Sequence, residues 1–199
     1  SVATVNISAY KTAGTDGNTS VCDNSVASIN LFNLITGEDM GGIWIRTTGT
    51  GGTFNAAAGT FTPAPGTTTS TFTYTITGTA PCANSTSVAT VNISTYKSAG
   101  IDANTSVCDY SMTPINLSSM ISGEAAGGSW SRTTGTGGLF NASTRTFVPT
   151  PGATTSTFTY TITGTAPCSN DASVATIFIT PKPTATIAPK TNVICSGGS

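Results

Sequence analysis

An 86-residue period organises the sequence, because the segment Val-Ala-Thr-Val-Asn-Ile-Ser at 2–8 returns at 88–94. Roughly 70% of the paired positions in the two copies are identical. The cysteines and tryptophans follow the same period, as Cys22, Trp44 and Cys82 and then Cys108, Trp130 and Cys168. Solenoid units have only about 20 to 50 residues, whereas a copy of 86 residues is long enough to form its own small core. We therefore predict a row of separately folded domains.

The period also sets the expected domain boundaries. Residues 10–95 and 96–181 are predicted to be two complete domains. Residues 1–9 are predicted to be the closing strand of a preceding repeat, with a donor strand for another chain as the alternative. Residues 182–199 are predicted to be a linker and the start of a truncated third domain, because a Pro-Lys-Pro segment ends the second copy.

The hydrophobic pattern indicates strands. From 71 to 77 the residues Phe72, Tyr74 and Ile76 alternate with threonines, which is typical of a strand with one buried face. Each copy has about seven such short segments, separated by Gly, Pro and Asn turns. This pattern predicts an all-β fold, with each copy an antiparallel β-sandwich around a central tryptophan.

Three apolar residues are predicted to face outward. Ile43 and Ile45 become serines in the second copy, whereas Trp44 between them is unchanged, so the variable pair points away from the core. Phe178 takes the place of the outward-facing Asn92. We expect either scattered surface residues or contacts with a neighbouring domain or another copy in a fibre.

The cysteines predict an oxidising compartment, since each copy carries two of them. We expect one disulfide per domain, Cys22 with Cys82 and Cys108 with Cys168, on the assumption that both cysteines of a copy lie at one pole of the sandwich. Closing such a loop stabilises a domain by about 4 kcal/mol in the chain-entropy model. The alternative pairs Cys82 with Cys108 and Cys168 with Cys195, and either scheme leaves one cysteine unmatched.

Catalysis and metal binding find little support. The chain has no histidine, so it lacks the commonest general base and the commonest metal ligand. The acidic pair Glu38 and Asp39 becomes Glu124 and Ala125 in the second copy, so a two-carboxylate site is not maintained. The remaining acidic residues, such as Asp16, lack calcium-loop spacing. We predict that the protein is not an enzyme and has no catalytic, cofactor or metal site.

Charge excludes two classes of partner. Only 8% of the residues are charged and the net charge is -1, which is unsuited to nucleic acid or an anionic membrane. No apolar run approaches the roughly 20 residues of a membrane span. Glycans are a candidate partner, because Asn6 and Asn92 lie in Asn-X-Ser motifs and face outward on strands.

The order of motifs resembles a known family. In the first copy the motifs are Cys22, 41–44, 51–55, 59–63, 72–76 and 80–82. They resemble the immunoglobulin-like repeats of giant Bacteroidota surface proteins, such as gliding-motility-type adhesins and type IX secretion cargo. The resemblance covers both copies, and 194–198 resembles the start of another repeat type from these proteins. It implies immunoglobulin-like domains, export and surface display, and it carries over no catalytic residue.

Three functions fit these features. The leading hypothesis is a structural or adhesive segment of an extracellular, cell-surface stalk or fibre. The first alternative is a subunit of a self-assembling filament, built by lateral packing or by donor-strand exchange. The second alternative is a module that binds carbohydrate or a surface, for which Trp44 and Trp130 are weak candidates because a core position suits them better.

Overall fold

The computed structural model describes residues 1–187, and Cys195 lies outside them. Contacts divide the chain into two compact units. The first unit contains Ser1–Ala99, Gly123–Gly128 and Thr161–Ala172. The second contains Gly100–Ser122, Ser129–Tyr160 and the described residues 173–187. Within the described residues, no helix is long and apolar enough to cross a bilayer.

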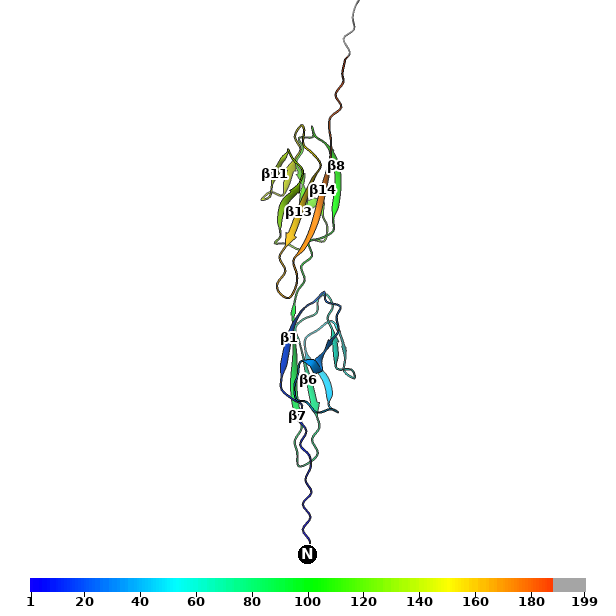
Figure 1. Cartoon of the computed structure of the whole chain (residues 1–199), viewed down its shortest axis with the longest axis vertical. Coiled ribbons are helices and arrows are strands. Elements are labelled where there is room, and N and C mark those ends of the chain that lie inside the picture. Colours follow the sequence, from blue (N-terminus) through cyan, green and yellow to red (C-terminus); the bar gives the residue numbers. More distant parts are fainter. Residues whose placement is uncertain (188–199) are drawn as a thin grey trace, which may run out of the picture. The chain divides into compact units, whose positions relative to one another are not determined.

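The first copy of the repeat forms a sandwich of two sheets (Figure 1). One sheet has the order β1-β7-β6-β3 and the other the order β2-β5-β4. A single 3-10 turn, Leu31–Asn33, follows β2, and its first residue is fully buried. The strands are β1 Gly17–Cys22, β2 Ile29–Asn30, β3 Ile43–Thr48, β4 Thr53–Asn55, β5 Thr60–Thr62, β6 Ser70–Ile76 and β7 Ser85–Ser94.

The second copy repeats this arrangement. Its sheets have the orders β10-β13-β14-β8 and β11-β12-β9. The strands are β8 Ala103–Cys108, β9 Ile115–Asn116, β10 Ser129–Thr134, β11 Leu139–Asn141, β12 Thr146–Val148, β13 Ser156–Ile162 and β14 Asp171–Thr180. The predicted fold class, tandem immunoglobulin-like β-sandwiches with seven short strands in each copy, is confirmed.

The core follows the alternation expected from the sequence. In β6, Phe72, Tyr74 and Ile76 are 0–2% exposed, and the intervening threonines are half-buried. Trp44 is buried against the Tyr74 ring, with 5.1 Å between the ring centroids. The Tyr74 hydroxyl donates to the Asp39 carbonyl at 3.0 Å and accepts from the Gly42 amide at 2.9 Å. Trp44 is therefore a core residue, as predicted, and so is Trp130, which is 5% exposed.

The first and last strands of each copy run parallel, unlike the antiparallel arrangement that was expected. β1 pairs with β7 from Gly17 opposite Ala89 to Cys22 opposite Ser94, and β8 pairs with β14 in the same way. Five strands separate β1 from β7 in the chain, so no hairpin forces them to be antiparallel. As a result, each copy begins at one pole of its sandwich and ends at the opposite pole.

Candidate functional site: the cystine at the end of strand β1

A disulfide joins Cys22 to Cys168, with 4.9 Å between the Cα atoms and a sequence separation of 146. Cys82 and Cys108 are half-buried free thiols. The predicted pairs Cys22–Cys82 and Cys108–Cys168 are therefore wrong. The alternative scheme is wrong as well, because Cys82 does not bond Cys108 and because Cys168 is not available to Cys195.

The error has a geometric cause. Cys22 lies beside Ser94 at the end of β7, whereas Cys82 lies in the loop that precedes Ser85 at the start of β7. A strand of ten residues spans roughly 30 Å. The two cysteines of one copy thus lie at opposite poles of the sandwich, and the assumption of a shared pole fails.

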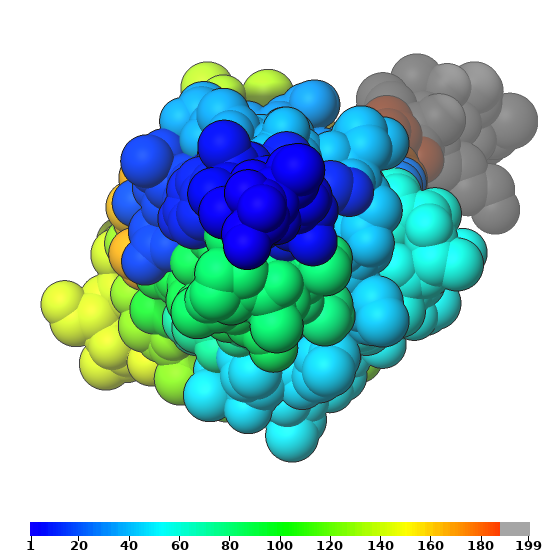
Figure 2. Space-filling model, turned by 90° about the horizontal axis from the view of Figure 1, so that it is seen from below, coloured from blue at the N-terminus to red at the C-terminus, as the bar shows by residue number. Residues whose placement is uncertain are grey.

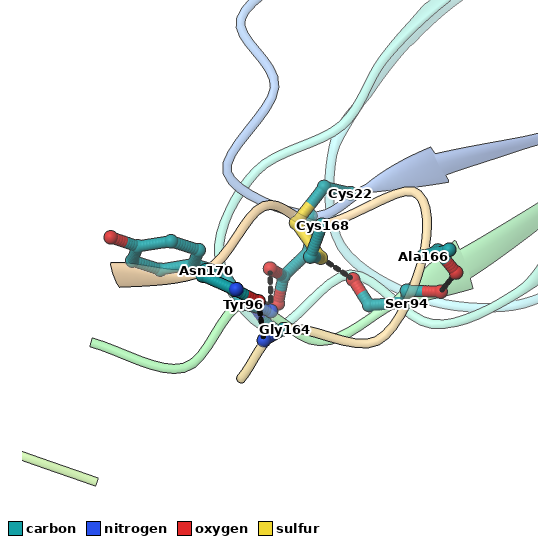
Figure 3. Close-up of a disulfide and its surroundings, with 9 residues drawn as sticks. Cys22, Ser94, Tyr96, Gly164, Ala166, Cys168 and Asn170 are labelled. Carbon is teal, nitrogen blue, oxygen red and sulfur yellow. Dashed lines mark hydrogen bonds between the residues drawn. A yellow bond between two sulfur atoms is a disulfide. The ribbon is translucent and has the colours of Figure 1, made fainter. Parts of the chain in front are cut away.

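Ser94 lies at the centre of the disulfide site (Figure 3). It is opposite Cys22 in the β1–β7 ladder. The sulfur of Cys168 lies 3.3 Å from the Ser94 carbonyl oxygen, and the Ser94 hydroxyl donates to the Ala166 carbonyl at 3.0 Å. The last residue of β7 therefore contacts both the strand and the loop that supply the two sulfurs.

The loop that carries Cys168 is fixed by local hydrogen bonds. The Asn170 side chain accepts from the Gly164 amide at 3.0 Å, and the Cys168 amide donates to the Thr165 carbonyl at 2.9 Å. A Cβ atom on Gly164 would collide with the Ser169 carbonyl oxygen, so this close approach requires glycine. The loop of the first copy, which carries Cys82, has the same bonds between Gly78 and Asn84 and between Cys82 and Thr79.

An aspartate follows Cys22 at the end of β1 and Cys108 at the end of β8, and it organises the same pole of each copy. Asp23 is 3% exposed and accepts from the Tyr96 amide at 2.8 Å and the Gly66 amide at 3.2 Å. Asp109 accepts from the amides of Gly152 and Lys182 in the equivalent way. The bond from Gly152, the larger of these two effects, helps to hold the pKa of Asp109 below its ordinary value.

The other two aspartates that are candidate calcium ligands also accept from the backbone. Asp16 accepts from the Val88 amide and Asp102 from the Val174 amide, both at 2.8 Å. Within residues 1–187, no cluster of three or more candidate metal-ligating side chains occurs. These carboxylates therefore act as anchors for strand ends.

One further residue, Asp171, contributes to the site without having been predicted. Its carboxylate accepts from the Ala99 amide at 2.8 Å and from the Tyr96 hydroxyl. These bonds, led by the one from Ala99, hold the pKa of Asp171 below its ordinary value, and the same hydrogen bond raises the pKa of Tyr96. The first copy has Ser85 in the equivalent position, where its hydroxyl accepts from the Ala13 amide at 2.9 Å. The change from Ser85 to Asp171 between the copies is the sequence signal that could have identified this residue.

The candidate interface and glycosylation residues are exposed. Ile43 and Ile45 are 65% and 57% exposed on β3, and Phe178 is 46% exposed on β14. Asn6 and Asn92 are also exposed, and the Asn92 side-chain amide donates to the Thr19 carbonyl at 3.2 Å. Their roles in contact or glycosylation stay predictions.

Comparison with solved structures finds similarities at low sequence identity. The chain is similar to Drosophila N-cadherin EC1-4, with 5% identity and a TM-score of 0.38 over 83% of this chain and 49% of that chain. It is similar to an I-band fragment of titin, with 7% identity and a TM-score of 0.41 over 83% of this chain and 63% of that chain. A third similarity is to an endo-fucoidan hydrolase from glycoside hydrolase family 107, with 12% identity and a TM-score of 0.24 over 70% of this chain and 24% of that chain. The chain thus spans less than two thirds of each structure.

No protein-family model matches the chain, and no curated protein matches its sequence.

Proposed function

We propose that this chain is a structural, force-resisting segment of an extracellular stalk or fibre made of tandem immunoglobulin-like domains. The parallel pairing of the first and last strands of each copy carries the proposal. Tension that the backbone carries through a copy pulls β1 and β7 in opposite directions along their shared ladder, whereas the Cys22–Cys168 bond, where it is formed, carries the tension covalently. All the ladder hydrogen bonds then oppose the load together, instead of opening one at a time.

The described side chains also fit a structural role. The carboxylates of Asp23, Asp109 and Asp171 accept backbone hydrogen bonds. The Arg46 guanidinium donates to the Gly51 carbonyl and to the Ser70 hydroxyl, both at 2.6 Å. These groups hold turns and strand ends, so they serve the fold instead of a substrate.

An extracellular location is part of the proposal. The Cys22–Cys168 disulfide supports it, because such bonds persist in oxidising compartments. The motif order that resembles Bacteroidota surface repeats further suggests export by type IX secretion and display on the cell surface. Labelling intact cells with an antibody against the chain tests this location, and a signal found only after lysis would contradict it.

The force-resisting role can be tested by single-molecule stretching in reducing buffer, where the backbone alone carries the tension. The Asp23 amide donates to the Ser94 carbonyl, so the amides of Val21 and Thr19 also face β7, while that of Ser20 faces away. We expect Thr19→Pro to lower the unfolding force of the first copy, because proline removes a ladder donor. Ser20→Pro is the matched control and should keep the force. Equal forces in the wild type and Thr19→Pro would contradict the proposal.

A filament subunit is the second candidate function, and residues 1–8 favour it. These residues repeat the sequence of 87–94 in β7, yet they lie outside the strands. Val5 is 81% exposed, whereas its equivalents Val91 and Ile177 are fully buried. A segment with this pattern is suited to completing a sandwich, either that of a preceding repeat or that of another chain.

Electron microscopy of the native protein tests this second function, with regular filaments as the expected result. Val5→Asp should prevent assembly, because it places a charge at the position that is buried in the complete copies. Asn6→Asp is the control, since the equivalent Asn92 is exposed. Filaments that form equally well from Val5→Asp would exclude strand donation.

Lateral packing is the other route to a filament. The exposed Ile43 and Ile45 on the edge strand β3 are the candidate contact, and Phe178 is a second one. The double variant Ile43→Ser and Ile45→Ser copies the second repeat, so its fold should be intact. Loss of side-by-side association in this variant would support lateral packing, and unchanged association would remove the pair as a contact.

A further inference from the structure

Ser8, Ser94 and Thr180 are spaced by the 86-residue period. Ser94 and Thr180 end β7 and β14, whereas Ser8 lies outside the strands. At Ser94 a complete disulfide site is present. Cys22, which we call a first-strand cysteine, lies opposite Ser94 in the ladder. Cys168, which we call a loop cysteine because it precedes the last strand of its copy, has its sulfur 3.3 Å from the Ser94 carbonyl. The bond forms where the strand end, the first-strand cysteine and the loop cysteine meet.

At Ser8 the loop-cysteine half of the same site is present. The sulfur of Cys82 lies 3.8 Å from the Ser8 carbonyl oxygen. The Ser8 hydroxyl donates to the Ala80 carbonyl at 3.3 Å, as the Ser94 hydroxyl does to the equivalent loop. Figure 2 shows the dark blue amino-terminal segment directly beside a green surface region, in agreement with the bond between Ser8 and Ala80. The missing component at Ser8 is a first-strand cysteine.

At Thr180 the other half of the site is present. Cys108 lies opposite Thr180 in the β8–β14 ladder, as Cys22 lies opposite Ser94. The Asp109 amide donates to the Thr180 carbonyl at 3.0 Å, the distance also found between Asp23 and Ser94. The missing component at Thr180 is a loop cysteine.

We propose that Cys82 and Cys108 are the two open halves of this disulfide site, and that each bonds the complementary cysteine of another copy of the repeat. Cys82 takes a first-strand cysteine, and Cys108 takes a loop cysteine. The partner repeat belongs either to the same longer polypeptide or to a second molecule. Since the free thiols of Cys82 and Cys108 are complementary, a second copy of the chain carries a partner for each of them. When two copies bond in this way, the site forms around one of two residues, either Thr180 of the copy that supplies Cys108 or Ser8 of the copy that supplies Cys82.

The chemistry is ordinary thiol oxidation. The two thiols lose two protons and two electrons, and one S–S bond forms. The electrons reduce a small disulfide such as oxidised glutathione, which is released as two thiols. The inference rests on the proposed function, because it assumes an array of repeats. Its test detects covalent bonds, whereas the test of the proposed function measures an unfolding force. The two proposals can therefore fail separately.

Two complementary variants test the proposal in the full chain. Both carry Cys195→Ser, and one adds Cys82→Ser while the other adds Cys108→Ser. Each is incubated alone with oxidised glutathione, and then the two are mixed. We expect monomers from each variant alone and a reducible dimer from the mixture, seen by non-reducing electrophoresis.

Tryptic mapping confirms which cysteines are joined, because trypsin places the four described cysteines on separate peptides. These peptides are 12–46, 47–97, 98–132 and 146–190, since proline follows Lys182. The dimer should contain 47–97 bonded to 98–132. Every variant should keep 12–46 bonded to 146–190, which shows that the first unit is folded. No dimer in the mixture, or equal dimers from either variant alone, would overturn the proposal.

The native protein distinguishes the two sources of the partner. Its thiols are alkylated at lysis before digestion, so that no bond forms afterwards. A ladder of high mass that collapses on reduction indicates bonds between molecules. Bonded 47–97 without such a ladder indicates repeats of one polypeptide. Alkylated Cys82 and Cys108 would show that both are free thiols in the native protein, and would overturn the proposal.

Discussion

Arg145 occupies in the second copy the position that Gly59 holds in the first, and both residues have left-handed backbone angles, φ 58° and φ 62°. A Cβ atom on Gly59 would lie 2.7 Å from the Phe32 ring and 2.9 Å from the Trp44 indole nitrogen. The second copy has Ser118 in place of Phe32, so the side chain at 145 has more room. The two substitutions compensate for each other.

We therefore expect Arg145→Gly to stabilise the second copy by about 1 kcal/mol, because glycine adopts this φ without steric cost. Gly59→Ala should destabilise the first copy by a larger amount, since the added methyl group meets the buried Trp44 ring and the half-buried Phe32 ring. Thermal unfolding of both variants checks the prediction. A lower melting temperature for Arg145→Gly would contradict it.

The stability of each copy should depend on the hydrogen-bonding geometry of the guanidinium group of Arg46 or Arg132, and not only on its positive charge. Arg46 donates to the carbonyls of Gly51 and Thr48 and to the Ser70 hydroxyl, and it lies 5.1 Å from the Phe61 ring centroid. A lysine cannot make these bonds together. We expect Arg46→Lys to cost about 1 to 3 kcal/mol of unfolding free energy in denaturant titrations.

Arg145→Lys is the matched control for that experiment, since Arg145 is exposed. It should leave the denaturation midpoint unchanged. Equal midpoints for Arg46→Lys and the wild type would show that charge alone matters at the β3–β4 turn.

Acid should weaken the fold through its aspartates. Asp109 and Asp171 have lowered pKa values in the folded chain, because backbone amides donate to their carboxylates. The folded state thus binds these protons more weakly than the unfolded state, whose aspartates titrate near about pH 3.9. Their contribution to stability is complete above about pH 5 and is lost as the pH falls through the lowered pKa values.

The measurement is the melting temperature between pH 7 and pH 2. Asp171→Ser, which copies Ser85 of the first repeat, should show a smaller decrease than the wild type. An identical decrease in both proteins would remove Asp171 from the explanation.

The disulfide should stabilise the first unit. Closing a loop of 146 residues contributes at most about 5 kcal/mol in the chain-entropy model. We expect Cys22→Ser to lower the melting temperature, and reducing agent to have the same effect on the wild type. Cys82→Ser is the control, because that thiol is free. A melting temperature that reduction leaves unchanged would contradict a stabilising disulfide.

Sequence patterns predicted the sandwich because alternation reports burial directly. The alternation of Phe72 and Tyr74 with threonines requires a strand with one buried face, and both aromatic side chains are buried in the structure. The outward direction of Ile43 followed from a comparison of the two copies, which reveals tolerance of serine. These inferences depend on local properties of a strand.

The disulfide pairing could not be predicted, because it depends on three-dimensional distances that a local sequence pattern does not report. Cys22 and Cys82 lie at opposite ends of β7, and the bonded partner, Cys168, is 146 residues away. The number of cysteines is the same for every pairing scheme, so it does not distinguish one scheme from another. The role of Asp171 was equally hidden, because its partners Tyr96 and Ala99 precede it by more than 70 residues.

The connectivity of the cystine makes residues 23–167 a closed covalent loop. When the oxidised chain is stretched from its ends, tension passes from β1 through the sulfurs to Cys168 and leaves the loop slack. Unfolding of the enclosed sequence then adds no length, although 146 residues could extend by about 500 Å once the bond is reduced. The redox state of a single bond therefore sets whether this segment behaves as an inextensible tether or as a shock absorber.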